Sequence, residues 1–338
     1  MTPPAPPFRH LRRLTDGGGL YEHAERTSVR PEHGYCLDDA ARALVVLCRE
    51  PDPDGAHDDL RELYLTFVLA AEDGAGRFRN RLDRERSWQG TPSVEDCWGR
   101  ALWGLGATVA STAEPARRDA ALATFERGAR WRSPWSRAMA FAALGAADVL
   151  RALPAHREAR ALLTAAALQI SAPAQVPGWP WPEARLSYAN AVVPEVLLAA
   201  GATLDDPSLL AAGLRLLDWL LEVQTRNGHL SVVPVGGRGP ADGAPGFDQQ
   251  PIEVAALADA CARAYALTGQ QRWADAVQLA AAWFLGANDS GTALYDPDSG
   301  GGCDGLEQHG RNENQGAEST LALISTLRQA RSVSLCPR

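Results

Sequence analysis

Carboxylates, amides and aromatic rings gather in six short segments of this sequence. These segments are residues 33–39, 88–96, 179–188, 247–253, 303–307 and 312–318. Aromatic faces stack on the apolar side of a pyranose ring, while acids and amides hydrogen-bond its hydroxyl groups. Helix capping and turn formation explain any one such residue equally well, but they explain all six segments together poorly. The segments therefore predict a pocket with the chemistry that a sugar needs.

Two carboxylates that flank a glycosidic bond can hydrolyse it, one ionised to activate water and one protonated to help the leaving group depart. An inverting enzyme places them about 6.5–9.5 Å apart. The candidates for this pair are Asp39, Glu95, Asp248, Glu253, Glu313 and Glu318. The dipole of a helix N-terminus should keep Asp39 and Asp248 ionised, which suits the base. A neighbouring like charge favours a protonated carboxyl at Glu95 and Glu313, which suits the acid.

A second group of residues is expected to bind the substrate. It contains His33, Tyr35, Asp38, Asp96, Trp98, Trp179, Trp181, Tyr188, Gln249, Gln250, Asn312 and Asn314. Of these, Trp179, Trp181 and Tyr188 should form a stacking wall that faces the carboxylates. The six cysteines show no metal-ligand or disulfide spacing, so neither a metal nor another cofactor is expected.

A repeated pair of charged residues lies beside the candidate carboxylates. The pattern D-x-x-x-R-A-L begins at Asp38 and again at Asp96. An Asp and an Arg four residues apart can pair along one helix face, and the Asp suits the positive end of the helix. We interpret the repeated pairs as architectural. Asp39 and Glu95, which lie next to them but outside the repeat, are then the better candidates for catalysis.

Two other functions fit the same segments. A sugar epimerase or isomerase needs bases that remove and return a proton, and His33, His229 and His309 all fall between expected helices. Such an enzyme requires a free anomeric centre, whereas a hydrolase requires a glycosidic bond. A non-catalytic glycan-binding partner of a glycosyltransferase would need fewer carboxylates than this sequence carries. We therefore rank hydrolysis first among the three.

The elements that must position these residues follow from an internal repeat. A glycine-containing motif recurs at residues 16–21, 73–78, 177–181, 227–231 and 289–295. Between its copies lie pairs of apolar-periodic segments of helical length, bounded by capping and turn residues. The expected pairs are 38–50 with 58–73, 94–112 with 116–130, 134–152 with 156–170, 188–202 with 207–225, 252–268 with 271–286, and 316–331 with 7–15.

One segment of each pair is rich in Ala and Gly, which lets a helix pack closely on all sides, so it is expected in an inner ring. Its partner carries charges on one face and is expected in an outer ring. The pattern predicts an all-α fold, an (α/α)6 barrel in which residues 1–338 form one domain. Residues 7–15 are expected to close the ring against the last inner helix. The candidate residues then share the mouth at the N-terminal ends of the inner helices.

Four segments carry a resemblance to a known family: HGYCLDDAARAL (33–44), EDCWGRALW (95–103), FDQQPIE (247–253) and NENQGAESTL (312–321). They resemble the six-hairpin glycosidase-like family, the (α/α)6 domain found attached to, or encoded beside, bacterial glycosyltransferases and mannoside phosphorylases. The resemblance extends from His10 to about Arg331. It implies the same fold, an oligosaccharide substrate such as a mannoside, and an association with a glycosyltransferase or glycoside phosphorylase. The chain shows no paired βαβ units and no Gly-rich nucleotide loop of its own.

Composition narrows the partners further. The net charge of -8 argues against nucleic acid and anionic membranes, which select for basic surfaces. No stretch reaches the roughly 18 apolar residues of a membrane helix, and residues 1–7 lack the apolar core of a signal peptide. The sequence therefore predicts a cytoplasmic, carbohydrate-active enzyme.

Overall fold

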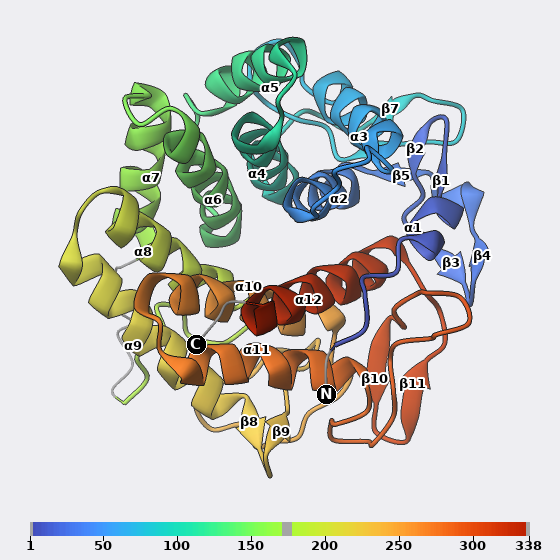
Figure 1. The fold of residues 1–338 in the computed structure, drawn as a ribbon, viewed down its shortest axis with the longest axis vertical. Coiled ribbons are helices and arrows are strands. Elements are labelled where there is room, and N and C mark those ends of the chain that lie inside the picture. Colours follow the sequence, from blue (N-terminus) through green and yellow to red (C-terminus); the bar gives the residue numbers. More distant parts are fainter. Residues whose placement is uncertain (1–2, 171–177, 336–338) are drawn as a thin grey trace.

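The computed structural model describes residues 3–170 and 178–335, which form two concentric rings of helices (Figure 1). The inner ring contains α2 (Leu37–Arg49), α4 (Asp96–Ser111), α6 (Ser136–Ala152), α8 (Val192–Thr203), α10 (Pro251–Thr268) and α12 (Ala317–Leu335). The outer ring contains α1 (Arg9–Arg13), α3 (Asp58–Ala70), α5 (Pro115–Gly128), α7 (Arg157–Ile170), α9 (Pro207–Val223) and α11 (Gln271–Phe284). The predicted all-α class and (α/α)6 barrel are confirmed.

Each inner helix contacts the next one around the ring, and α12 returns to contact α2. Each also packs against the outer helix that follows it in sequence, while the short helix α1 contacts α12. Helix boundaries follow the predicted pairs closely: the segment 134–152 becomes α6 and the segment 271–286 becomes α11. Among the described residues, no helix has both the length and the apolar character that a membrane span requires.

Glycine brings neighbouring inner helices into backbone contact. A Cβ atom added to Gly106 of α4 would lie 2.2 Å from the carbonyl oxygen of Gly145 in α6. One added to Gly145 would lie 2.1 Å from the carbonyl oxygen of Leu102. Larger residues would force α4 and α6 apart, so the Ala and Gly content of these segments sets the ring's inner radius.

Capping residues set the ends of several helices. The Asp206 carboxylate accepts hydrogen bonds from the backbone N–H groups of Ser208, at 2.9 Å, and Leu209, at 3.2 Å, and Pro207 occupies the first position of α9. At the other kind of end, Gly269 adopts a left-handed conformation with φ of 65° and terminates α10.

We call the segment from the end of an outer helix to the start of the next inner helix a return. Short strands lie in these returns and pair with one another. They are β1 (Thr15–Asp16), β2 (Gly19–Leu20), β3 (Ala24–Glu25), β4 (Ser28–Val29), β5 (Tyr35–Cys36), β6 (Arg81–Leu82), β7 (Trp88–Gln89), β8 (Thr225–Arg226), β9 (His229–Leu230), β10 (Gly305–Glu307) and β11 (Gly310–Asn312). A 3-10 turn covers Pro31–His33.

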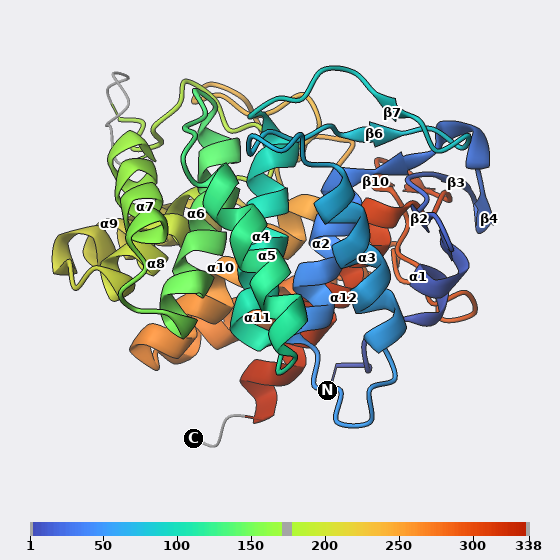
Figure 2. The same cartoon turned by 90° about the horizontal axis from the view of Figure 1, so that it is seen from above.

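All the ladders among these strands are antiparallel, and β5, β6 and β7 form one three-stranded sheet in which Leu82 lies opposite both Tyr35 and Trp88. This sheet joins the returns before α2 and before α4. A bridge from Gln249 to Leu306 likewise joins the returns before α10 and α12. Figure 2 shows β6 and β7 at one end of the helices, where the inner helices begin.

Candidate active site

A cavity of about 390 Å³ opens at the N-terminal ends of the inner helices. In the described part of the chain, its charged lining consists of Glu22, His23, Asp38, Asp39, Arg42, Arg81, Asp96, Arg100, Asp304 and Glu318. Tyr188, Gln250 and Ile252 complete the side that faces α4 and α12. Its size lies near the lower end of the range of small-molecule sites, which suits a short ligand.

One arginine joins two carboxylates on neighbouring helices. The Nη1 group of Arg42 donates to Oδ1 of Asp39 at 2.5 Å, and its Nη2 group donates to Oε2 of Glu318. Asp39 and Arg42 lie one turn apart on α2, whereas Glu318 is in the first turn of α12. Arg42 therefore holds the two ends of the ring together at the mouth.

A second arginine repeats this arrangement between α2 and α4. The Nη1 group of Arg100 lies 2.9 Å from Oδ1 of Asp38 and 3.6 Å from Oδ2 of Asp96. The side-chain amide of Asn80 also donates to Asp38, at 3.0 Å. On the other side of the cavity, the Tyr188 hydroxyl donates to Asp96. Each arginine is thus shared by two carboxylates.

These contacts correct the interpretation of the D-x-x-x-R-A-L repeat. Arg42 pairs with Asp39 rather than with Asp38, because Asp38 faces α4 and pairs with Arg100. Asp39 is therefore not the carboxylate left without a partner. The repeated residues also line the cavity rather than serving the ring alone.

Two arginines cannot neutralise four carboxylates, so this cluster favours binding a proton. Asp39 is 3% exposed. Burial raises its pKa to about 7, against the attraction of Arg42 and with the repulsion of Glu318. The helix dipole was expected to keep Asp39 ionised, but the loss of solvation is the larger effect. Arg42 is shared with Glu318, so its attraction offsets only part of this increase in the pKa of Asp39.

Asp38 responds in the opposite direction. Its burial alone would raise the pKa of the carboxyl. Attraction to Arg100 and Arg42, with hydrogen bonds from Arg100 and Asn80, outweighs burial and holds the pKa below its ordinary value. The pKa values of Asp38 and Asp39, adjacent residues of one helix turn, thus shift in opposite directions within one cavity.

Two further carboxylates of the cavity have raised pKa values. Burial raises the pKa of Asp96, although Arg100 opposes it. Burial also raises the pKa of Asp304, although the backbone N–H of Gly316 donates to this carboxyl at 2.8 Å. Glu22, by contrast, forms an ion pair with Arg81 at the outer edge.

Three potential metal ligands lie together in this cavity. One side-chain ligand atom each of Glu22, Cys36 and Asp39 falls within 4.8 Å of the other two. Both carboxylates already bind an arginine, Arg81 for Glu22 and Arg42 for Asp39. Burial raises the pKa of the Cys36 thiol well above its ordinary value, which disfavours the thiolate that a metal needs. The arrangement fits an ion-pair network better than a metal site.

Of the six predicted catalytic carboxylates, Asp39 and Glu318 line the cavity. Three others are exposed to solvent: Glu95 at the N-cap of α4, Asp248 before α10, and Glu313, which binds Arg311. They lie near the N-terminal ends of the inner helices, but their side chains do not line the cavity. Acidic residues that are neighbours in the sequence do not indicate whether a side chain lies at the rim of the cavity or in its interior.

Glu253 is buried below the cavity rather than in its wall. It is 2% exposed, and its Oε2 accepts a hydrogen bond from Asn190 at 2.8 Å. The Asn190 side-chain oxygen in turn accepts from Arg137 at 3.0 Å, and Arg137 also donates to the carbonyl of Tyr188 at 2.8 Å. Glu253 therefore supports the segment that carries Tyr188.

The predicted stacking wall requires correction. Trp179 and Trp181 are 8% and 0% exposed, and their rings lie 5.0 and 6.0 Å from the ring of Trp219 on α9. These two tryptophans therefore seal the space between a return and an outer helix. Only Tyr188 of the predicted three lines the cavity.

The remaining substrate-binding candidates divide in the same way. Asp38, Asp96 and Gln250 line the cavity. Six others lie outside its wall, either buried or at the surface: His33, Tyr35, Trp98, Gln249, Asn312 and Asn314. Trp98 illustrates the buried kind, since it is 0% exposed and its indole N–H donates to the carbonyl of Gly128.

Sequence reasoning missed several residues of the wall. Glu22 and His23 directly follow the first glycine-containing motif, and Arg81 lies in the return that pairs with β5. Asp304 fell within a segment recognised as part of the mouth, but nothing in its spacing distinguished it from its neighbours. The recurring motif was the available signal for Glu22, because every copy leads toward this mouth.

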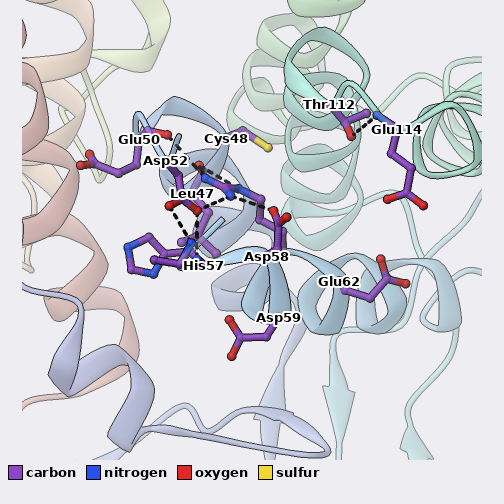
Figure 3. Close-up of polar contacts among 12 residues, drawn as sticks. Leu47, Cys48, Glu50, Asp52, His57, Asp58, Asp59, Glu62, Thr112 and Glu114 are labelled. Carbon is purple, nitrogen blue, oxygen red and sulfur yellow. Dashed lines mark hydrogen bonds and ion pairs between the residues drawn. The ribbon is translucent and has the colours of Figure 1, made fainter. Parts of the chain in front are cut away.

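A second acidic cavity, of about 340 Å³, lies at the opposite end of α2 (Figure 3). The Asp52 carboxylate in this cavity stabilises the local structure. Asp52 accepts from Arg61 at 2.6 Å and from the backbone N–H of His57 at 2.9 Å, while Arg61 also donates to the carbonyl of Leu47 at 2.9 Å. These bonds fasten the turn between α2 and α3, so this cavity is a weaker candidate.

Solved structures similar to this fold include enzymes whose names give different actions on sugars. No family profile and no curated protein matches the sequence. A sugar epimerase from a ruminal bacterium has a TM-score of 0.68 at 12% identity, with 95% of each chain covered. A GH76 α-mannanase from Bacteroides thetaiotaomicron has a TM-score of 0.66 at 11% identity, covering 96% of this chain and 92% of that one.

A third solved structure, a D-mannose isomerase, has a TM-score of 0.72 at 10% identity, covering 96% of this chain and 94% of that one. At such identities the likeness shows the fold. It agrees with the ring of six helical hairpins that the sequence predicts.

Proposed function

We propose that the protein is a carbohydrate-active enzyme, and more specifically a glycoside hydrolase that acts on a short oligosaccharide such as a mannoside. One observation carries the proposal. Asp38 and Asp39 line the same cavity, and their surroundings move the two pKa values in opposite directions. Pairs of carboxyls separated in this way take the acid and base roles in glycoside hydrolysis.

In the proposed reaction, Asp39 donates its proton to the glycosidic oxygen as the bond to the anomeric carbon breaks. Asp38, kept ionised by Arg100, accepts a proton from the water that attacks the same carbon. This division of roles gives inversion at the anomeric centre. Inversion is the outcome predicted from the sequence, but the roles differ, because the sequence assigned Asp39 to the base and Asp38 to substrate binding. Tyr188 and Gln250 are placed to hydrogen-bond sugar hydroxyls, and Ile252 offers an apolar contact.

The test is a screen of oligosaccharides, mannosides first, with product analysis by chromatography. Proton NMR in the first minutes then identifies the anomer released. We expect cleavage with inversion and its loss in both Asp38→Asn and Asp39→Asn. Retention of configuration would show that a carboxylate acts as nucleophile, so Asp38 could not be the base of an inverting reaction. Full activity in either variant would refute the mechanism.

A specific observation also supports epimerase or isomerase chemistry. His23 lines the cavity next to Glu22, although the three histidines predicted for this role do not. His229, for example, binds Asp289 at 3.0 Å away from the cavity wall. An epimerase would incorporate deuterium at carbon 2 when free mannose or cellobiose is incubated in heavy water, and His23→Ala would abolish the exchange. A hydrolase would leave both sugars unlabelled.

A further inference from the structure

Two exposed tryptophans lie on the shortest return at the mouth of the candidate site. This return covers residues 129–135 between α5 and α6, whereas residues 71–95 between α3 and α4 carry two strands. Trp131 is 39% exposed and Trp135 is 59% exposed. In the part of the chain that the structure describes, no other tryptophan is among the exposed large apolar side chains.

Both residues are held in place despite their exposure. The indole N–H of Trp131 donates to the carbonyl of Ala75 at 2.7 Å, and the guanidinium of Arg77 lies 5.8 Å from its ring. The backbone N–H of Trp135 donates to the Ser133 hydroxyl at 3.1 Å, and Trp135 caps α6. The ring of Trp131 is therefore held by its own contacts, and the backbone of Trp135 is held at the start of α6. A held ring costs little entropy to use in binding.

The position of Trp135 relates it to the cavity. Arg137 follows it by two residues and donates to the carbonyl of Tyr188 at 2.8 Å. The Tyr188 hydroxyl reaches Asp96, and both residues line the cavity. Neither Trp135 nor any described residue of α6 lines the cavity, so Trp135 lies outside its wall. It stands at the N-terminus of α6, at the same mouth as the cavity, and Arg137 and Tyr188 connect the two.

We propose that Trp135, with Trp131 beside it, stacks on sugar units of the substrate that extend outside the cavity. The proposal rests on the proposed function and defines the substrate further: a neutral glycan longer than the cavity holds. An indole face offers a pyranose ring contact without any charge, and the held ring of Trp131 gives this contact at low entropic cost. We identify the ligand of these tryptophans as the substrate because they share a mouth with the candidate site, and not because they are exposed.

The test measures binding of manno-oligosaccharides of one to six units by isothermal titration calorimetry. Wild-type protein is used if it does not cleave them, and the Asp39→Asn variant if it does. We expect Trp135→Ala to weaken binding of the hexasaccharide about threefold to tenfold, the usual contribution of an aromatic contact. Binding of mannose and mannobiose should not change, and Trp135→Phe should retain most of the affinity for the hexasaccharide.

Leu267→Ala is the matched control, because Leu267 is also an exposed apolar residue, 41% exposed, but lies toward the opposite end of α10. Equal weakening for all chain lengths, or affinity independent of length in the unsubstituted protein, would refute the platform. The proposal would also be refuted if the protein formed a dimer that Trp135→Ala dissociates in sedimentation while glycan binding stays unchanged, since the surface would then bind protein.

Length-dependent binding without cleavage would refute hydrolysis but would support stacking of the glycan on Trp135.

Discussion

The two mouths of the barrel have opposite charge. The candidate site at the helix N-termini is lined, among the described residues, by six carboxylates and three arginines. A cavity of about 720 Å³ at the helix C-termini is lined by Glu195, Asp259 and four arginines, namely Arg49, Arg151, Arg263 and Arg328. The partial positive charge of helix N-termini favours acids, and the negative charge of C-termini favours arginine. The architecture therefore explains the sign of charge at each mouth without any catalysis.

The two mouths also differ in how their carboxylates pair with arginines. At the C-terminal mouth each buried carboxylate has its own arginine: Glu195 lies 3.0 Å from Arg263, and Asp259 lies 2.8 Å from Arg49. At the N-terminal mouth, Arg42 and Arg100 are each shared by two carboxylates. An excess of carboxylates over arginines favours protonated carboxyls at the N-terminal mouth. Burial raises the pKa of Glu195 at the other mouth as well, although its own partner Arg263 opposes it. The shared arginines are therefore the difference that supports the proposal of the N-terminal mouth as the reactive one.

Apolar side chains separate the two charged regions along the barrel axis. A narrow space of about 50 Å³ connects them, with Val45, Val46, Ile252 and Leu321 in its wall. The rings of Trp103 and Phe141 also line it, together with Arg42 and Glu318 from one mouth and Glu195 and Asp259 from the other. Substitutions at one mouth should therefore leave the chemistry of the other intact. Matched pairs of variants, one from each mouth, can test the comparison.

The largest expected effect is on turnover, from Asp39→Asn compared with Asp259→Asn. The amide at position 39 cannot donate the proton, so kcat should fall by about 10²–10⁴-fold, the usual contribution of general acid–base catalysis. Asp259 is also buried, but it binds Arg49 at the other mouth, so its variant should change kcat less than about threefold. Equal losses in the two variants would show that Asp39 acts only through stability.

The sequence was sufficient to predict the fold because hydrophobic periodicity and Gly content act locally. The Ala- and Gly-rich segment 134–152 could only be a helix packed on all sides, and it became α6 with Gly145 against α4. The contact of α1 with α12 agrees with the expectation for residues 7–15, although closure of the ring stays a prediction.

The site was harder to predict because its contacts join helices that are distant in sequence. The repeat located Asp38 and Arg42, but pairing depends on which helix each residue faces, and Asp38 turns to Arg100. Aromatic residues gave a similar ambiguity. Nothing local reveals that Trp181 packs against Trp219, whereas Trp131 and Trp135 are exposed at this mouth.

The next largest effect compares the arginines. Arg42→Ala leaves Asp39 and Glu318 without a cation, and Arg49→Ala leaves Asp259 without one, so each should cost about 3–5 kcal/mol of unfolding free energy at pH 8. Only Arg42→Ala should also abolish turnover. Its stability loss should be smaller at pH 5, where Asp39 holds a proton in both proteins. Urea denaturation at the two pH values measures this, and a pH-independent loss would contradict it.

A third comparison concerns buried glutamates and pH. Burial raises the pKa of Glu253 from 4.5 to about 7, and its Oε1 has no hydrogen-bond partner among the described residues. The folded state therefore holds this proton more tightly than the unfolded state. Stability should fall between about pH 4.5 and 7 as the unfolded state releases the proton first, by about 3 kcal/mol in total.

Glu253→Gln removes this dependence, so it should match the wild type near pH 4.5 and exceed its stability at pH 8. Glu195→Gln is the control from the other mouth. It deprives Arg263 of its partner and should destabilise the protein at pH 8. Urea denaturation across this range measures both variants, and parallel curves for wild type and Glu253→Gln would show that Glu253 does not titrate in the folded protein.

The smallest effect compares the two tyrosines, Tyr188 and Tyr265, which line opposite cavities. Tyr188→Phe removes the hydrogen bond to Asp96, worth about 1 kcal/mol, so kcat should fall about fivefold. The backbone contact with Arg137 remains, so the ring should keep its place. Loss of a donor to the ionised carboxyl raises the pKa of Asp96 further, and the pH–rate profile should shift to higher pH. Tyr265→Phe should change neither quantity; if both variants shift the profile alike, the two mouths are coupled and the electrostatic separation by the apolar neck is refuted.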